Sequence, residues 1–298
     1  MRRALPLLLL VAGCAAPPRQ GGIVSTNPCA DAILATLVPE QLAAVSHYSH
    51  DPAATSLPLA VALRYPATAG TAEEVIARAP DLVVTDSFAP AATRAAYAKA
   101  GLRVLTLGSV ATIAASERQV MEIADAVGRP ERGRAMVAEI EAASSLYTPP
   151  RRRPGPSGEG GSNGAQRQPT AVHQLGPGLR RGGVLGRQPS ALFYIAGDLA
   201  NGSGTLLDDL LAHAGFRNAA ADYGLAYTGT LPIETIAAHP PAVILSPGDG
   251  RTAELRRRVL ARSHADTREA YFPRQLMNCG GPSIAPALAR LAAIRRGL

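Results

Sequence analysis

The side chains that could carry chemistry in this chain are few, and histidine and cysteine come first. His47 and His50 are three residues apart, a spacing at which two imidazoles can share a metal ion. Their neighbours are Ser, Asp and Pro, and this context favours a polar surface loop. Cys29 and Cys279 lie in loop-like segments near opposite ends of the chain. They are candidates for a disulfide, for soft metal ligands or for ordinary buried thiols.

Signatures of common enzyme classes do not occur in the sequence. Gly202-Ser203-Gly204-Thr205 stands between an expected strand and an expected helix, as a phosphate loop would, but it lacks the Gly-Lys-Ser/Thr ending of a P-loop. We interpret it as a strand-to-helix turn. No Gly-x-Ser-x-Gly elbow stands between an expected strand and an expected helix, since the match at 160–164 lies in a Gly- and Pro-rich segment. No His-Glu-x-x-His helix is found. The sequence therefore favours binding over catalysis.

Two glutamates stand at matching places in two segments that resemble each other. Glu73 lies seven residues before Pro80, and Glu234 lies seven residues before Pro241. A short apolar run follows each proline. Such an internal echo is typical of a chain that is built from two similar units. We therefore expect two lobes, each of which carries one of the glutamates.

Short apolar runs alternate with helical segments in both halves of the chain, which predicts parallel α/β sheets. Residues 112–146 have helical periodicity that is interrupted at Gly128-Arg129-Pro130, so they form two helices or one bent helix. We expect two Rossmann-like lobes that are joined by this long helical strut. The expected strands are 23–25, 42–45, 82–84, 104–107, 191–195 and 242–245.

Ligands of open parallel sheets bind at the carboxyl ends of the strands. Two lobes would bring these loops face to face across a cleft, and their small, aromatic and polar residues suit a bulky, partly apolar ligand. A disulfide between the two cysteines would hold such lobes closed and hinder ligand access, so we expect no such bond. The predicted ligand-binding residues are Asn27, Pro28, Cys29, His47, Tyr48, Ser87, Phe88, Gly197, Asp198, Asn201, Tyr223, Cys279, Gly280 and Gly281.

The first residues have the layout of an export signal. Two arginines precede an apolar run over 4–11, which is too short to span a bilayer. Residues 11–14 resemble the bacterial lipobox, in which the cysteine, here Cys14, is lipidated and becomes the mature N-terminus. The alternative is cleavage after Ala16, which would leave a soluble protein. In both cases we expect the mature protein outside the cytoplasmic membrane.

Residues 149–189 differ in composition from both flanks. Seven arginines and one acid account for most of the net charge of +7. Gly, Pro, Gln and Ser supply much of the rest, so the segment cannot bury enough surface to offset its chain entropy. We expect a disordered insertion, or a segment that is read out of frame. The remaining chain is nearly neutral, which argues against a nucleic-acid partner.

At 298 residues and 47% apolar content the chain is long enough for two domains. The expected organisation is a signal and tether over 1–21, an N-terminal lobe over 22–111, connecting helices over 112–148, the insertion over 149–189 and a C-terminal lobe over 190–298.

Four segments together resemble the class III periplasmic substrate-binding proteins of cobalamin and ferric-siderophore importers. The resemblance covers about residues 22–146 and 190–298 and departs from the family at the insertion. It implies two α/β lobes, a connecting long helix and one ligand in the cleft. The ligand it implies is a cobalt- or iron-containing chelate (corrinoid, haem or iron siderophore), and the implied partners are an ABC permease and its ATPase. The segments are Ile23 through Asp31, Glu73 through Val84, Gly204 through Phe216 and Glu234 through Leu245.

The resemblance also gives the echoed glutamates a role. In this family one surface glutamate on each lobe docks onto arginines of the permease, and Glu73 and Glu234 stand at the matching positions. A carboxylate and a guanidinium form a bidentate, charge-assisted pair, which fixes orientation. The alternative is that both are solvated carboxylates near helix N-termini, and Glu74 is a possible substitute for Glu73.

We therefore predict a non-catalytic solute receptor with no resident cofactor or protein-bound metal. A second hypothesis is an exported enzyme, such as a chelatase or hydrolase, that acts on a metal chelate on the same scaffold through His47, His50, Cys29 or Cys279. A third is a lipoprotein whose cleft no longer binds a ligand.

Overall fold

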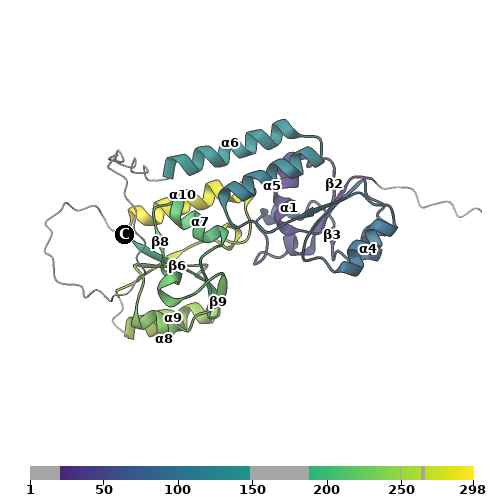
Figure 1. Ribbon diagram of the computed structural model, residues 1–298. Coiled ribbons are helices and arrows are strands. Elements are labelled where there is room, and N and C mark those ends of the chain that lie inside the picture. Colours follow the sequence, from purple (N-terminus) through teal and green to yellow (C-terminus); the bar gives the residue numbers. More distant parts are fainter. Residues whose placement is uncertain (1–20, 148–187, 249, 263–265) are drawn as a thin grey trace, which may run out of the picture.

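The computed structural model describes residues 21–147, 188–248, 250–262 and 266–298. Figure 1 shows two α/β lobes, with helices α5, α6 and α10 along one side of them. The predicted export signal, Cys14 and nearly all of the predicted insertion lie outside the described residues. Among the helices of the described ranges, none is long and apolar enough to cross a membrane.

The N-terminal lobe is built on a five-stranded parallel sheet with the strand order β3-β2-β1-β4-β5. The order reverses between β1 and β4, and ligands of open α/β sheets bind at such a switch point. The strands are β1 (Ile23–Ser25), β2 (Leu42–Ser46), β3 (Ala67–Thr68), β4 (Leu82–Asp86) and β5 (Val104–Leu107). The helices are α1 (Pro28–Leu37), the 3-10 turn η1 (His47–His50), α2 (Leu59–Ala62), α3 (Ala72–Ala77) and α4 (Ala91–Lys99).

The sequence Asn27-Pro28-Cys29-Ala30 explains why α1 begins where β1 has just ended. The Asn27 Oδ1 accepts hydrogen bonds from the backbone N–H groups of Cys29 at 2.8 Å and Ala30 at 3.1 Å, which caps the helix. Pro28 occupies the first helical turn, where a missing N–H costs nothing. The strand-to-helix transition at the switch point is therefore fixed locally.

The C-terminal lobe has a six-stranded sheet with the order β11-β10-β6-β7-β9, in which β8 also pairs with β6. Its strands are β6 (Ser190–Ala196), β7 (Leu199–Asn201), β8 (Arg217–Asn218), β9 (Thr228–Thr230), β10 (Val243–Ser246) and β11 (Arg268–Tyr271). Its helices and 3-10 turns are α7 (Leu206–His213), η2 (Ala219–Tyr223), α8 (Ile233–Ala238), α9 (Gly250–Arg262), η3 (Arg274–Leu276), η4 (Gly281–Ser283) and α10 (Ile284–Arg296).

One part of the C-terminal sheet departs from the predicted parallel arrangement. Strand β7 runs antiparallel to both of its neighbours, β6 and β9. The turn at Gly197-Asp198 is too short for a crossover, so it folds β7 directly back onto β6. Gly197 has a φ of 54°, a conformation that favours glycine.

Two separate helices, α5 (Ile113–Ala126) and α6 (Pro130–Tyr147), form the connection between the lobes. They pack closely, because a Cβ added to Gly133 would lie only 2.4 Å from the Cβ of Ala124. The interruption at 128–130 thus separates two helices, and the alternative of one bent helix is wrong.

Helix α5 is held by one lobe at each end. At its start, the Ile113 N–H donates to Asp209 Oδ2 of α7 at 2.7 Å. At its end, the Arg103 guanidinium of the N-terminal lobe donates to the Ala126 carbonyl at 2.8 Å. This helix therefore spans the distance between the two sheets.

One hydrophobic core continues through both lobes. It includes Ile33 of α1, Val120 of α5, Ile140 of α6, Phe193 of β6 and Leu288 of α10. Packing between these elements is shared, so the lobes are not independent units joined by a linker.

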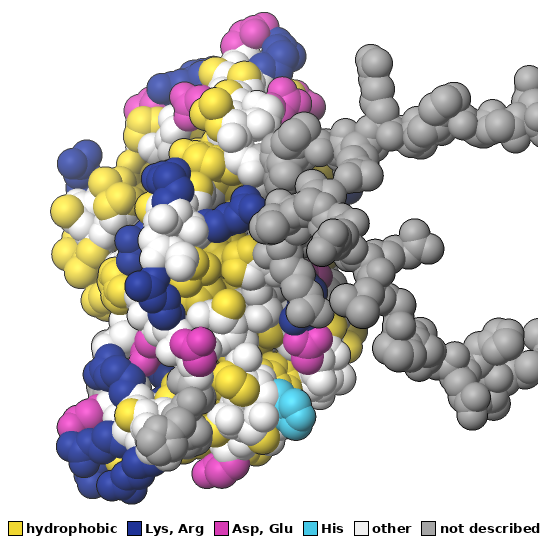
Figure 2. Space-filling model, turned by 90° about the vertical axis from the view of Figure 1, so that its left-hand side faces the viewer, with side chains coloured by type: hydrophobic (Ala, Val, Ile, Leu, Met, Phe, Trp, Pro, Cys, Tyr) yellow, Lys and Arg dark blue, Asp and Glu magenta, His cyan; other side chains and the backbone are white. Residues whose placement is uncertain are grey.

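One end of the C-terminal lobe is rich in exposed arginines. Helix α9 carries the exposed Arg251, Arg257 and Arg262. Figure 2 shows Lys and Arg side chains at the bottom of the molecule, where α8 and α9 lie in Figure 1.

Candidate functional site

Segments that follow strands of different lobes meet at one place, which we take as the candidate site. Asn278, in the segment after β11, donates from Nδ2 to the Ala54 carbonyl beyond η1 at 2.9 Å. The Gly281 N–H in the same segment donates to Ser116 Oγ of α5 at 2.7 Å. The loops at the carboxyl edge of the N-terminal sheet are therefore in contact with the C-terminal lobe.

Cys29 and Cys279 form a disulfide at this meeting point, with Cα atoms 5.2 Å apart. The expectation that the bond would be absent is therefore wrong. Such a bond would hinder ligand access only if it lay across the opening between the lobes. It joins instead two segments that already pack closely. A Cβ atom added to Gly281 would lie only 2.8 Å from Ile33 of α1, and a Cβ atom added to Gly280 would lie only 2.3 Å from Ser116 Oγ.

The disulfide also removes both cysteines from the thiol chemistry that the enzyme hypothesis required. Neither sulfur is available as a nucleophile or a metal-binding thiolate while the bond is intact. Among the described residues, no group of three or more His, Cys, Asp and Glu side chains is placed to hold a metal ion.

The turn η1 presents Tyr48 at the end of β2. The side chain of Tyr48 is 52% exposed, and its ring lies 4.1 Å from that of His47. His47 bonds through Nδ1 to the Thr68 carbonyl at 3.3 Å, whereas His50 bonds through Nε2 to the carbonyls of Ala62 and Tyr65. The two imidazoles thus have different backbone partners.

The loop after β4 presents the most exposed aromatic side chain of the described residues, Phe88, which is 80% exposed. Its N–H donates to Asp86 Oδ1 at 2.8 Å, and the Ser87 N–H donates to the Leu107 carbonyl at 3.0 Å. The Asn27 carboxamide donates to Asp86 Oδ2 at 3.4 Å. The loops after β1, β4 and β5 are therefore tied together beneath Phe88.

In the C-terminal lobe the predicted residues are mainly structural. Asp198 Oδ1 accepts a hydrogen bond from the Tyr194 hydroxyl at 3.0 Å. Asn201 is buried, donates to Thr228 and accepts from the Thr205 hydroxyl at 2.6 Å. The Tyr194 hydroxyl also donates to the Leu231 carbonyl at 3.1 Å. These bonds shape the β6–β7 hairpin and the entrance to α7.

Tyr223 lies apart from the other predicted residues. Its hydroxyl donates to the His239 carbonyl at 2.6 Å, ahead of the start of β10. The Tyr223 hydroxyl therefore lies at the end of the sheet where β10 begins, opposite to the end where β10 and β11 finish. Burial, with the nearby Asp222 carboxylate, raises the pKa of Tyr223 to about 12.

Two exposed tyrosines that the sequence analysis did not select lie closer to the meeting point. Tyr271 ends β11 and is 55% exposed. Tyr227 is 70% exposed with a φ of 59°, and its ring lies over Gly204, just before α7. A bulky side chain in the left-handed region is uncommon and points to a functional constraint. No sequence signal distinguishes Tyr227, because its backbone conformation depends on the hydrogen bond from Gly202 to its carbonyl.

Asp31 is the second feature that sequence analysis missed. A carboxylate in the first turn of a helix, as in α1, usually lies at the surface and interacts with the helix dipole. The structure shows a fully buried carboxyl whose Oδ2 accepts from the Ser46 N–H at 2.8 Å and the Ser49 hydroxyl at 2.6 Å. Burial raises the pKa of Asp31 to about 7, against hydrogen bonds from neighbouring serines that lower it.

The echoed glutamates occupy equivalent places in the two lobes. Glu73 lies in the first turn of α3, between β3 and β4, and Glu234 lies in the first turn of α8, between β9 and β10. Both side chains are exposed. Glu74 instead accepts from the Ala69 N–H at 2.9 Å and pairs with Arg78 at 3.5 Å.

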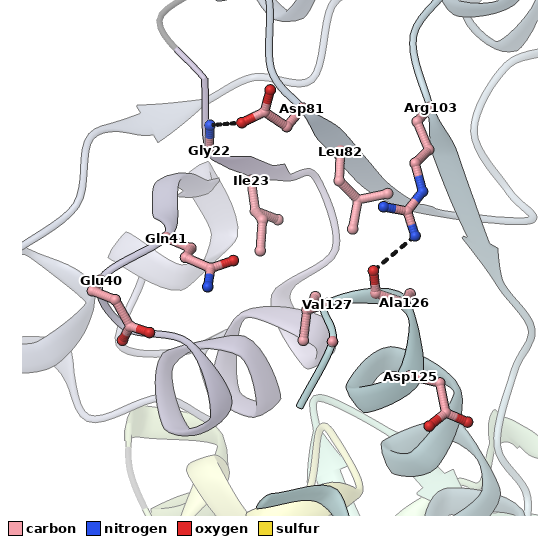
Figure 3. Close-up of a pocket in the computed structure, with 11 residues that line it drawn as sticks. Gly22, Ile23, Glu40, Gln41, Asp81, Leu82, Arg103, Asp125, Ala126 and Val127 are labelled. Atoms are coloured by element: carbon pink, nitrogen blue, oxygen red, sulfur yellow. Dashed lines mark hydrogen bonds between the residues drawn. The ribbon is translucent and has the colours of Figure 1, made fainter. Parts of the chain in front are cut away.

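A cavity of about 690 Å³ lies at the opposite edge of the N-terminal sheet, where β1 and β4 begin (Figure 3). Gly22, Asp81 and Arg103 line it, and the Gly22 N–H donates to Asp81 Oδ2 at 2.7 Å. None of the predicted ligand-binding residues, all of which are described, contributes to its wall. The cavity is therefore separate from the candidate site.

Comparisons with known proteins agree with this architecture. The family model described as periplasmic binding protein matches residues 23–145. Among curated proteins, no match to the chain was found. The two-lobed fold predicted from the family resemblance is confirmed by solved structures.

Three of these structures cover almost the whole chain. The periplasmic heme-binding protein RhuT from Roseiflexus sp. RS-1 is 22% identical with a TM-score of 0.59, and the match covers 92% of this chain and 97% of that one. The periplasmic heme-binding protein HutB of Vibrio cholerae is 16% identical with a TM-score of 0.65, and the match covers 93% of this chain and 99% of that one. The periplasmic vitamin B12-binding protein BtuF of Vibrio cholerae is 15% identical with a TM-score of 0.61, and the match covers 94% of this chain and 97% of that one.

Proposed function

We infer that this chain is a class III periplasmic substrate-binding protein, which captures a metal chelate outside the cytoplasmic membrane and delivers it to an ABC permease. The match of residues 23–145 to the periplasmic binding protein model and the fold shared with heme- and vitamin B12-binding proteins support this function. ATP hydrolysis then belongs to a partner, in keeping with a sequence that has no nucleotide-binding motif.

The observation that carries the proposal is the set of exposed aromatic side chains around the meeting point of the lobes. Tyr48 and Phe88 follow strands of the N-terminal sheet, whereas Tyr271 and Tyr227 belong to the C-terminal lobe. Exposed aromatic rings that gather in one region indicate a binding site, and such rings stack well on flat conjugated surfaces.

We therefore favour a tetrapyrrole chelate, haem or a corrinoid, over an iron siderophore. A tetrapyrrole offers a wide apolar face that several aromatic side chains can cover at once. In this arrangement Tyr48 and Phe88 would contact the ligand from one lobe, and Tyr227 and Tyr271 from the other. The hairpin residues Asp198 and Asn201 would shape the site through the hydrogen bonds that they already make.

The decisive experiment is a titration of the purified mature protein with haemin, cyanocobalamin and a ferric siderophore in parallel. We expect saturable 1:1 binding of one tetrapyrrole, followed by absorbance for haemin and by calorimetry for cyanocobalamin. Tyr48→Ala and Phe88→Ala should each weaken binding by about tenfold, because each loses a stacking contact of ~1 kcal/mol or more.

Leu63→Ala is the matched control, because Leu63 is also exposed but lies beyond α2. It should leave the dissociation constant unchanged. No saturable binding of any of the three ligands would overturn the proposal. Preferential binding of the siderophore would retain the receptor function but reject the tetrapyrrole.

We also propose that the protein is tethered to the membrane by a lipid on Cys14. The lipobox-like run over 11–14 supports this, and it lies outside the described residues. A labelled fatty acid should be incorporated into the wild-type protein and not into Cys14→Ser, which should be released in soluble form. Incorporation into both would contradict lipidation at this cysteine.

A further inference from the structure

The Asp31 carboxyl lies directly behind the turn that presents Tyr48. Ser46, whose N–H donates to Asp31 Oδ2 at 2.8 Å, ends β2, and its Oγ accepts from the Tyr48 N–H at 3.3 Å. Ser49, one residue beyond Tyr48, donates its hydroxyl to the same carboxylate oxygen at 2.6 Å. One buried carboxyl therefore contacts the residues on both sides of His47 and Tyr48.

The other contacts of the turn do not replace this anchor. His47 and His50 bond to carbonyls of Thr68, Ala62 and Tyr65, at the outer side of the turn. The Tyr48 side chain is half exposed, and its hydroxyl makes no hydrogen bond to another residue that the structure describes. Its direction follows from the backbone of the turn, which Asp31 holds from inside.

We propose that Asp31 is a positioning residue of the ligand site, because its carboxyl holds the turn His47–His50 in the conformation that presents Tyr48. The role for ligand binding rests on the proposed function, whereas the anchoring of the turn does not. Asp31 does not touch the ligand, and its effect is transmitted through Ser46 and Ser49.

The buried carboxyl makes this anchor sensitive to pH. Burial raises the pKa of Asp31 from 3.8 to about 7, and its Oδ1 has no hydrogen-bond partner among the described residues. When the turn opens, water reaches the Asp31 carboxyl, and its pKa falls back toward the ordinary value of an aspartate. The closed turn then binds a proton more tightly than the open one, so a rise in pH from about 4 to about 7 favours opening.

The titratable side chains near the turn are otherwise engaged. Asp51 accepts from the Ala53 N–H at 2.8 Å, and Cys29 on α1 is in the disulfide. His47 and His50, on the turn itself, face backbone carbonyls. Asp86, in the loop after β4, bonds to Asn27 and Phe88. The groups that contact the Asp31 carboxyl are serines, so its own protonation should dominate the response.

Amide hydrogen exchange of residues 46–50 tests the anchor without any ligand. Between pH 6 and pH 8, after correction for the intrinsic exchange rate, protection of the wild-type turn should fall by about tenfold, as the linkage of one proton requires. Asp31→Asn should abolish this change, because the amide does not titrate. Asp125→Asn, which removes an exposed carboxylate on α5, should behave as the wild type.

Ser49→Ala provides a second variant that leaves the buried carboxyl in place. It should increase exchange in residues 46–50 at pH 6, since it removes one of the two anchoring bonds. A pH response in Asp31→Asn equal to that of the wild type, or unchanged exchange in Ser49→Ala, would overturn the proposal.

Titration with haemin and cyanocobalamin at pH 6 and pH 8 tests the consequence for binding. The wild type should bind its ligand more weakly at pH 8 than at pH 6, by at most about tenfold, because the closed fraction of the turn sets the apparent affinity. Asp31→Asn should show the same affinity at both values. If the wild type binds neither compound, the tetrapyrrole function fails, while hydrogen exchange still decides the role of Asp31. If the ratio of the dissociation constants at pH 8 and pH 6 is the same for the wild type and for Asp31→Asn, the proposed effect of Asp31 on ligand binding is wrong.

Discussion

At the scale of single residues, the hydrogen bonds of Asn27, Asp31 and Tyr227 shape the surroundings of the candidate site. Asn27 and Pro28 were expected at the end of β1, and they stand there as cap and first-turn residue of α1. The buried role of Asp31 was not predicted, because a sequence does not show which side of a ten-residue helix faces the sheet ends. Tyr227 was missed since its strained backbone arises from contacts with residues 202 to 204, which only the folded chain brings together.

Replacement of Tyr227 should separate stability from binding. Tyr227→Asn keeps a polar residue that tolerates a φ of 59°, so the free energy of unfolding in urea should rise, by up to about 1 kcal/mol. The same variant should weaken tetrapyrrole binding, because it removes an exposed ring. Tyr271→Asn, at a residue without a positive φ, should weaken binding with no gain in stability. A loss of stability in Tyr227→Asn would show that the tyrosine is not strained.

At the scale of elements, the strands with continuous apolar runs were predictable. Strands β1 and β5 have the expected bounds, and β2, β4, β6 and β10 differ from expectation by one or two residues. The missed strands β3, β7, β8 and β9 have only two or three residues each, too few for any periodicity. Strand β11, with the sequence REAY, is polar at the edge of its sheet and lacks an apolar run.

The contact between α5 and α6 depends on Gly133. A Gly→Ala change inside a helix usually stabilises a protein by ~1 kcal/mol. Here the new Cβ would lie 2.4 Å from Ala124, so Gly133→Ala should lower the free energy of unfolding by about 1–2 kcal/mol instead.

The double variant Gly133→Ala with Ala124→Gly should recover most of the loss, because the second change restores the space between the helices. Thermal unfolding of the two variants and of Ala124→Gly alone would measure this coupling. A melting temperature of Gly133→Ala above that of the wild type would contradict the close packing of α5 on α6.

At the scale of the whole molecule, the echo of the two glutamates predicted the two lobes correctly. It could not predict how the lobes are fixed, because the shared core and the disulfide join residues far apart in sequence. The two sheets therefore share one continuous core. The ligand cleft between them remains a prediction that binding measurements must test.

Removal of the disulfide should weaken the whole fold. The double variant Cys29→Ser with Cys279→Ser should lose about 2–5 kcal/mol of unfolding free energy, because the bond constrains a very long loop of the unfolded chain. A reductant should lower the stability of the wild type by a similar amount and leave the variant unchanged. Equal stability of oxidised and reduced wild type would argue against the bond. Both lobes should still unfold in one transition, since their core is shared.

We propose that docking to a permease involves both lobes together. Glu73→Gln and Glu234→Gln should each reduce ligand uptake by cells, and the double variant should reduce it more than tenfold, since each loses a charge-assisted pair of ~1.5–3 kcal/mol. The dissociation constant for the ligand should stay unchanged. Glu139→Gln, an exposed carboxylate on α6, should leave uptake intact. Normal uptake by the double variant would refute this role.

The position of the two bonded cysteines has a consequence for how the molecule is made. They are 250 residues apart, and most of both sheets lies between them in sequence. The bond can therefore close only after the residues of both lobes up to Cys279 have been synthesised and the two thiols have met an oxidant. Oxidation therefore follows the synthesis of almost all of both lobes. Any chain truncated before residue 279 would present an unpaired thiol to the quality-control machinery.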